Sequence, residues 1–287
     1  MSELLTKTEY SAIAADLHVP SAAFVDGSYH AASGPSMAIF NPATGAELTT
    51  IAGASDDDVD FAVQKAREAF DSGVWSRCHP SERKEVMIRL CKLMTRNRHE
   101  LAVMESIDSG KPISDCATID LPETINTLKW HAEAIDKIYD DSAPVGDDAI
   151  AMIVREAVGV VACVLPWNFP MLMLAWKLGP ALAAGNSVIV KPAEQTSLTA
   201  LRIAELAHEA GLPRGVLQIL PGEGPTTGQA LGRHGDVDML SFTGSTDTGR
   251  HFLRYAADSN LKNVTLECGG KNPAIVLKDA QHLDYVA

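Results

Sequence analysis

The sequence predicts an α/β protein built on a doubly wound parallel sheet. From Val158 onward, short β-branched runs alternate with amphipathic segments of helix length. The first run, VGVVACVL over residues 158–165, is continuously apolar, which is typical of a strand buried on both faces of a parallel sheet. Short connections with right-handed crossovers would place the strand-to-helix turns on one edge of the sheet. Ligands bind at that edge in open α/β sheets.

Five strands and four helices are expected in this part of the chain. The strands are expected at residues 159–164, 187–190, 215–219, 238–242 and 262–267. The helices between them are expected near residues 170–184, 197–210, 226–233 and 246–257. Beyond them, residues 272–287 predict the first strand and turn of a further domain.

The N-terminal stretch predicts an arm followed by strands. Residues 1 to about 20 are expected to be a loosely held arm. Residues 24–50 predict a strand pair, because residues 26–27 and 41–45 carry turn chemistry.

Helices dominate from residue 55 to residue 139. Ser55 and Asp58 form a helix-start pair, and Gly73 ends that helix. Further helices are expected from about residue 81, over 98–108 and over 121–139. Then residues 140–144 predict a turn and 149–158 a strand, so a surface hairpin is expected there.

Composition narrows the possible functions. The 287 residues carry 24 Lys and Arg against 37 Asp and Glu, a net charge of −13, which disfavours nucleic acid and anionic membranes as partners. No apolar run of transmembrane length and no signal-peptide pattern is present, so a cytoplasmic location is expected. The five cysteines form no C-x-x-C pair, and neither a disulfide framework nor a metal site is expected.

Two polar turns close the first two strands of the sheet. The first is PWNFP over residues 166–170, and the second is KPAEQT over residues 191–196. Glu194 could accept hydrogen bonds from a ribose diol and would repel a 2′-phosphate, which favours NAD, whereas Lys191 could pair with that phosphate and so leaves NADP open. The structural alternative is a solvated ion pair between the two side chains.

A third turn could bind a phosphate. Gly244 to Gly249, GSTDTG, begins a helix, where free N–H groups attract anions and glycine allows close approach. The alternative is that Ser245 only caps the helix. The G-x-G-x-x-G pattern of the ordinary dinucleotide fold is absent.

Two further side chains suit catalysis at this edge. Asn168 could donate a hydrogen bond to an oxyanion, or it could simply hold its turn. Glu267 ends a strand, and partial desolvation there would raise its pKa toward that of a general base; a surface glutamate is the alternative. The neighbouring Cys268 is expected on the opposite face of its strand.

These motifs together resemble the aldehyde dehydrogenase superfamily. PWNFP, KPAEQT, FTGSTDTG over residues 242–249 and LECGGK over residues 266–271 occur in the family's order. The resemblance covers the whole chain and implies a variant Rossmann domain. It is strongest to enzymes acting on γ-glutamyl-γ-aminobutyraldehyde and other aminoaldehydes, with betaine- and broad-range aldehyde dehydrogenases as competitors. Cys268 departs from the aliphatic residue usual in the family.

The resemblance also assigns roles to residues. It makes Asn168 the oxyanion donor and Glu267 the base that activates water, with Lys177 as a possible proton relay. Substrate contacts are expected from Phe169, Leu172, Met173 and Trp176. Contacts to NAD, or to NADP, are expected from Val164, Leu165, Pro166, Trp167, Lys191, Pro192, Ala193, Glu194, Gly224, Gly228, Phe242, Thr243, Gly244, Ser245, Thr248, Gly249 and Gly269.

The resemblance finally implies a domain plan. Residues 1–139 and 158–269 would form the NAD-binding domain, 140–157 a β excursion for assembly into a homodimer or homotetramer, and 270–287 the start of a truncated catalytic domain. The family's nucleophilic cysteine is expected beyond residue 287, so the chain alone is expected to be inactive. A non-catalytic nucleotide-binding or assembly protein is the alternative, and a thiol sensor using Cys163 or Cys268 is a more distant one.

Overall fold

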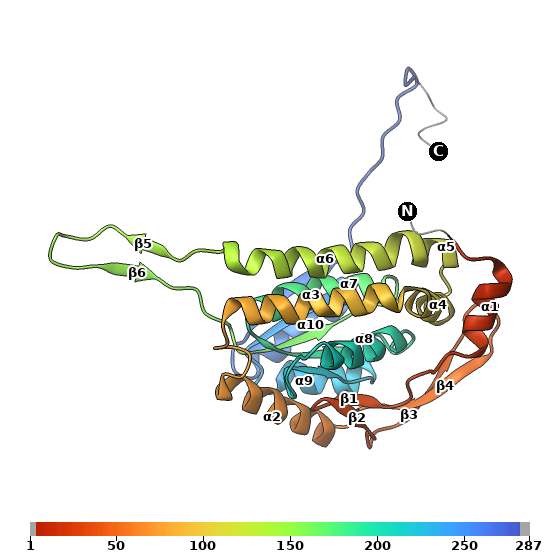
Figure 1. The fold of residues 1–287 in the computed structure, drawn as a ribbon, viewed down its shortest axis with the longest axis horizontal. Helices are drawn as coiled ribbons and strands as arrows, with labels where there is room; N and C mark the ends of the chain where they lie inside the picture. The colour runs from red at the N-terminus through yellow and green to blue at the C-terminus, as the bar shows by residue number, and fades with distance from the viewer. Residues whose placement is uncertain (1–3, 282–287) are drawn as a thin grey trace.

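A computed structural model describes residues 4–281 of the chain (Figure 1). Its centre is a seven-stranded sheet with the strand order β11-β10-β7-β8-β9-β1-β2. Residues 1–3 and 282–287, parts of the predicted arm and of the predicted second domain, lie outside the described residues. The strands are β1 (Ala23–Val25), β2 (Ser28–His30), β7 (Val160–Val164), β8 (Ser187–Lys191), β9 (Leu217–Ile219), β10 (Met239–Gly244) and β11 (Asn263–Cys268).

The sheet is parallel over the five strands that the sequence predicts, and its order reverses beside β7. From β7 the chain proceeds outward through β8 and β9, and it then returns to place β10 and β11 on the other side. This reversal is a topological switch point, where the turns after β7 and β10 diverge and leave a crevice.

Two N-terminal strands add an antiparallel edge that the sequence did not predict as part of this sheet. Phe24 of β1 pairs with Ile219 of β9, and β2 pairs with β1 through the expected turn at Asp26-Gly27. The pairing partner lies far away in the sequence, so local turn chemistry could place the hairpin but not its neighbour. The other N-terminal strands, β3 (Ser36–Phe40) and β4 (Glu47–Ala52), form a separate antiparallel pair.

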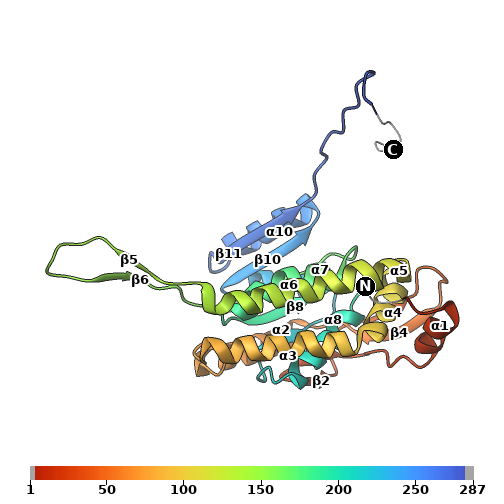
Figure 2. The same cartoon turned by 45° about the horizontal axis from the view of Figure 1, so that its top comes forward.

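Helices cover both faces of the sheet, as the continuous apolar strands predict. Val161 and Cys163 of β7 face one core, and Val160, Ala162 and Val164 face the other. The first core is covered by α3 (Pro80–Arg96), α4 (Arg98–Ser109), α6 (Leu121–Ala134), α7 (Pro170–Ala183) and α8 (Leu198–Glu209). The second is covered by α2 (Asp56–Ser72), α9 (Gln229–Arg233) and α10 (Thr246–Ala257). Figure 2 shows α10 beside β10 and β11.

Several short helical segments complete the fold. They are α5 (Ile113–Asp115), the π-helical segments η1 (Cys116–Asp120) and η3 (Gly224–Gly228), and the 3₁₀ segment η2 (Ile135–Lys137). The helix predicted over residues 121–139 therefore ends earlier, at Ala134, and tightens into η2. No helix within residues 4–281 is long and apolar enough to cross a membrane.

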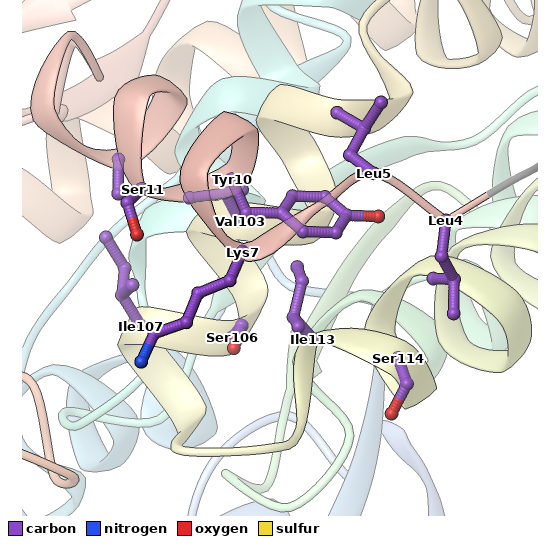
Figure 3. Close-up of a pocket in the computed structure, with 11 residues that line it drawn as sticks. Leu4, Leu5, Lys7, Tyr10, Ser11, Val103, Ser106, Ile107, Ile113 and Ser114 are labelled. Atoms are coloured by element: carbon purple, nitrogen blue, oxygen red, sulfur yellow. The ribbon is translucent and has the colours of Figure 1, made fainter.

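The expected N-terminal arm is instead partly helical. Helix α1 (Lys7–Ala15) begins with a capping box, in which Thr6 accepts from the N–H of Glu9 and Glu9 accepts from the N–H of Thr6. Tyr10 is buried on the outer side of α4, as Figure 3 shows. The prediction of a loose arm was wrong because this local cap and one buried aromatic side chain fix the helix.

A two-stranded ribbon projects from the body before β7 (Figure 1). Strands β5 (Asp141–Ala143) and β6 (Ala151–Ile153) pair antiparallel, with Ser142 opposite Met152. The expected hairpin is present, but the turn predicted at residues 140–144 was wrong. Asp141–Ala143 is a strand because residues 151–153 supply its partner.

Residues 269–281 leave the sheet without forming a strand (Figure 2). The strand predicted here has no pairing partner within the described residues, and Ile275 and Leu277 are exposed. The predicted turn falls at residues 278–279.

Candidate functional site

The candidate site is a cavity of about 570 Å³ at the switch point of the sheet. It opens at the carboxyl ends of β7, β8 and β10, where the three polar turns meet. Thirteen of the predicted cofactor residues line it: Val164, Leu165, Pro166, Trp167, Lys191, Ala193, Glu194, Gly224, Phe242, Thr243, Gly244, Ser245 and Thr248.

Glu194 has a defined orientation at the mouth of this cavity. Its Oε1 accepts a hydrogen bond from the backbone N–H of Gly224 at 3.0 Å, and its Oε2 lies 3.3 Å from Nζ of Lys191. Burial acts to raise the pKa of Glu194, but the charge of Lys191 and the backbone donors outweigh it, so the pKa is lowered. Glu194 is therefore an ionised acceptor facing a cavity.

Lys191 is buried beneath that carboxylate, with only 3% of its surface exposed. Burial lowers the pKa of Lys191, and the neighbouring Glu194 partly opposes this shift. The solvated ion pair considered from the sequence is therefore excluded for Lys191, which is a buried partner that orients Glu194.

The turn before α10 combines a cap with a possible anion site. Ser245 Oγ accepts from the N–H of Thr248 at 3.2 Å and donates to Thr248 Oγ1 at 2.9 Å. The capping role considered from the sequence is thus present. The remaining N–H groups of the first turn of α10, rather than the Ser245 hydroxyl, are the donors left for an anion.

Four predicted cofactor residues do not line the cavity. Pro192 lies outside it, Gly228 packs against Lys191 and Phe252, and Gly269 is exposed after β11. A Cβ on Gly249 would lie 3.1 Å from Sγ of Cys268, so this glycine allows α10 to approach β11. Five other residues line the cavity and were not predicted from the sequence: Gln195, Pro225, His251, Phe252 and Tyr255. Phe252 and Tyr255 lie with Ala256 on one helical stripe, and this pattern could have indicated two of the five.

Glu267 and Asn168 both lie at the carboxyl edge of the sheet. Glu267 is opposite Thr243 of β10, one position beyond the Phe242–Val164 pair, and Asn168 belongs to the turn that follows β7. Both side chains are exposed. The desolvation expected around Glu267 is therefore not supplied by the residues that the structure describes.

Lys177 lies on the same face of the sheet as Glu267. Its Nζ donates a hydrogen bond to Ser241 Oγ at 2.9 Å, on the strand between β7 and β11. Burial lowers the pKa of Lys177, while Cys163 and Glu267 act to raise it. A partly buried amine thus faces the carboxylate that the sequence singled out as a base.

None of the five cysteines reaches this face as a reactive thiol. Burial raises the pKa of Cys163 to about 12, and Cys268 packs on the α10 side, opposite Glu267. The prediction that Cys268 points away from the base is confirmed. Among the described residues, no group of three or more His, Cys, Asp or Glu is arranged to hold a metal ion.

The four predicted substrate residues divide into two groups. Met173 is buried in the core, and Leu172 packs against that core. Phe169 and Trp176 are 36% and 55% exposed. Helix α7 turns Met173 toward the core, so among the four it is the exposed Phe169 and Trp176 that the described residues leave open to a substrate.

A second cavity, of about 340 Å³, lies between α1 and the outer side of α4 (Figure 3). Apolar side chains and three serines make up most of its lining. It shares no residue with the switch-point cavity.

Comparison with known proteins gives consistent matches. The profile described as "Aldehyde dehydrogenase family" matches residues 29–287. The chain is 61% identical over 288 residues to aminoacetaldehyde dehydrogenase of Pseudomonas aeruginosa, covering 100% of this chain and 58% of that protein.

Two solved structures match with similar coverage. Gamma-glutamyl-gamma-aminobutyraldehyde dehydrogenase of Burkholderia cenocepacia matches with a TM-score of 0.95 and 47% identity. Indole-3-acetaldehyde dehydrogenase complexed with NAD+ matches with a TM-score of 0.95 and 48% identity. Each covers 98% of this chain, and the chain covers 57% of each. The chain therefore spans little more than half the length of these proteins.

Proposed function

Because this chain belongs to the aldehyde dehydrogenase family, we propose that it forms the cofactor-binding part of an enzyme that oxidises an aldehyde to a carboxylic acid with NAD. The substrate is proposed to be an aminoaldehyde. The names of two similar proteins, an aminoacetaldehyde dehydrogenase and a gamma-glutamyl-gamma-aminobutyraldehyde dehydrogenase, support this choice. The observation that carries the proposal is that Asn168, Glu194 and Glu267 all lie at the edge where the switch-point cavity opens.

The residues of that cavity fit a dinucleotide. Glu194 presents a carboxylate fixed by Gly224 and Lys191, which suits the hydroxyls of a ribose. The first turn of α10 offers N–H groups to phosphate oxygens. When bound, NAD would accept the hydride released from the aldehyde carbon.

Asn168 and Glu267 are proposed to serve the two halves of the reaction. The amide of Asn168 would donate a hydrogen bond to the oxyanion that forms when a nucleophile adds to the aldehyde, an effect worth about 3 kcal/mol in other enzymes. Glu267 would take a proton from the water that hydrolyses the acyl intermediate. Lys177, on the same face, is proposed to pass the proton on.

The nucleophile is proposed to be a cysteine outside residues 1–287. Cys163 is too deeply buried and Cys268 faces the wrong side of the sheet. The similar proteins extend well beyond the length of this chain. Residues 270–281 are proposed to lead toward the part of the protein that carries this cysteine.

The β5–β6 ribbon is proposed to mediate assembly of a homodimer or homotetramer. Ile150 and Met152 are 88% and 67% exposed on it, which favours burial against another copy. A cytoplasmic location is proposed because all five cysteines are free thiols.

The test is turnover by the complete protein that contains these residues. With NAD and aminoacetaldehyde, it should form NADH and glycine in equal amounts, faster than with propanal. Binding of NAD without NADH formation from any aldehyde would contradict the enzyme proposal and favour the non-catalytic alternative.

A further inference from the structure

Helix α4 carries two buried carboxylates that no catalytic assignment uses. Glu105 and Asp108 are 0% and 2% exposed, and their spacing of three residues puts them on one side of the helix. Buried carboxylates are costly unless their oxygens are hydrogen-bonded, so their partners indicate what they do.

Each carboxylate accepts a backbone N–H at the start of a different helix. Glu105 Oε1 accepts from the N–H of Met171 at 3.1 Å, in the first turn of α7, and its Oε2 accepts from the Thr199 hydroxyl of α8 at 2.9 Å. Asp108 Oδ2 accepts from the N–H of Leu198 at 3.0 Å, the first residue of α8. These pairs lie 66 and 90 residues apart in the sequence.

Neither helix supplies a cap of its own. Phe169 and Ser197 occupy the N-cap positions of α7 and α8, and neither makes a side-chain capping hydrogen bond. The first N–H groups of a helix need an acceptor, so α4 provides from outside what the local sequence does not.

The two capped helices follow the two turns of the candidate site. Asn168 lies three residues before Met171, and Glu194 lies four residues before Leu198. A third contact supports the first turn: Nζ of Lys111 lies 3.6 Å from the centre of the Phe169 ring. Lys111 is itself held 2.5 Å from Oδ2 of the buried Asp120.

We propose that Glu105 and Asp108 are positioning residues, Glu105 for the turn that carries Asn168 and Asp108 for the turn that carries Glu194. This inference rests on the proposed function, since it assigns the two turns to the oxyanion and to the cofactor. It predicts that two neighbouring residues on one helix affect two different kinetic steps.

Charged groups around Glu105 make its contribution depend on pH. Burial raises the pKa of Glu105 to about 7; the N–H of Met171 and the Thr199 hydroxyl oppose this, Asp120 adds to it and Lys111 lowers it. Asp108 lies on the same helix, and burial raises its pKa well above the ordinary value. Cys116 is a thiol with a pKa raised to about 12 and stays neutral near pH 7. An ionised Glu105 is the stronger acceptor, so it should hold its turn better above pH 7 than below it.

The experiment uses the complete protein and two pairs of variants. Glu105→Met and Asp108→Leu remove the acceptor while keeping most of the volume, and Glu105→Gln and Asp108→Asn keep one acceptor oxygen. Glu133→Gln, an exposed change on α6, is the control. Stopped-flow NADH fluorescence gives the rate of the first hydride transfer, and titration gives the NAD dissociation constant.

Glu105→Met should slow the first hydride transfer about 10-fold or more and leave NAD binding within about 2-fold. Asp108→Leu should weaken NAD binding about 10-fold and leave hydride transfer at saturating NAD within about 2-fold. The Gln and Asn variants should recover most of each loss. The unaltered protein should transfer hydride faster at pH 8 than at pH 6, and Glu105→Gln should flatten this change.

The division of roles would be overturned if Glu105→Met and Asp108→Leu each lost hydride-transfer rate and NAD affinity to the same extent. Normal hydride transfer and normal NAD binding in both variants would also overturn it. If the Met or Leu variant does not fold, the pH profile of Glu105→Gln decides, because an unchanged profile would contradict the positioning role of Glu105. For Asp108, the Asp108→Asn variant decides, because a loss of hydride-transfer rate larger than its loss of NAD binding would contradict its role. An unaltered protein without any NADH burst would instead refute the proposed function.

Discussion

Glu194 accepts a hydrogen bond from the N–H of Gly224 across the mouth of the switch-point cavity, at 3.0 Å. The acceptor belongs to the turn after β8 and the donor to the start of η3, so two separate turns are joined at one carboxylate. This contact fixes where negative charge faces the cavity, and we expect the selectivity between dinucleotides to depend on it.

Replacing Glu194 with Gln or Ser should reduce the preference for NAD over NADP. The ionised carboxylate repels a 2′-phosphate, so its removal should narrow the ratio of the two dissociation constants by about 10-fold. Titration of both dinucleotides into the complete protein measures this ratio. Glu209→Gln, an exposed acid at the end of α8 that does not line the cavity, is the control. Tighter binding of NADP than of NAD by the unaltered protein would refute the idea.

Glu267→Gln and Asn168→Ala should affect different phases of turnover. The Gln variant should lose about 100-fold in steady turnover but keep the initial burst of NADH, because acyl formation requires no water. The Ala variant should slow the burst itself about 100-fold, because the oxyanion loses its donor. Stopped-flow NADH fluorescence separates the two phases. A Glu267→Gln protein that is folded yet lacks the burst would contradict this division.

A polypeptide of residues 1–287 should not oxidise aldehydes. Burial raises the pKa of Cys163 to about 12, and Cys268 packs against α10 on the far side of the sheet from Glu267. The measurement is NADH production from an aminoaldehyde by this purified polypeptide, with Cys268→Ser beside it. Steady turnover that disappears in Cys268→Ser would show that Cys268 is a nucleophile after all.

The stability of the Glu105→Gln variant, measured relative to the unaltered protein, should increase as the pH rises. The folded pKa of Glu105, about 7, lies above the ordinary 4.5, so the folded state binds a proton that the unfolded state releases between these values. Stability therefore falls with rising pH through this window, a penalty of up to about 3 kcal/mol that a neutral Gln avoids. Urea unfolding at pH 4.5 and pH 8 measures the change. A stability difference between variant and unaltered protein that is independent of pH would contradict it.

The sequence predicted what depends on local pattern. Continuous β-branched runs located all five parallel strands, and Ser55 with Gly73 bounded α2 correctly. Strand alternation was enough to place Cys268 opposite Glu267. The motif residues of the three turns do gather in one cavity, because parallel strands bring their carboxyl ends to one edge.

What the sequence could not predict depends on distant partners. Nothing near Phe169 or Ser197 in the sequence indicates that α4 caps the helices that begin there. Glu105 and Asp108 lie 66 and 90 residues away from the N–H groups whose hydrogen bonds they accept. The residues at Asp141–Ala143 favour a turn locally, but pairing with Ala151–Ile153 makes them a strand. The burial of Lys191 likewise depends on packing that its own motif does not encode.

During synthesis, the β1–β2 hairpin is made well before β9, the strand that it pairs with in the finished sheet. The N–H of Asp26, at the end of β1, donates to the side chain of Gln218, which lies 192 residues later. At roughly 5–20 residues per second, the β1–β2 hairpin emerges roughly 10–40 s before its neighbour β9 exists. Phe24 and Val25, 3% and 2% exposed in the finished sheet, are uncovered during that interval. Chaperone binding to the nascent chain should therefore be strongest while Phe24 and Val25 are uncovered. It should end once residue 219 has left the ribosome.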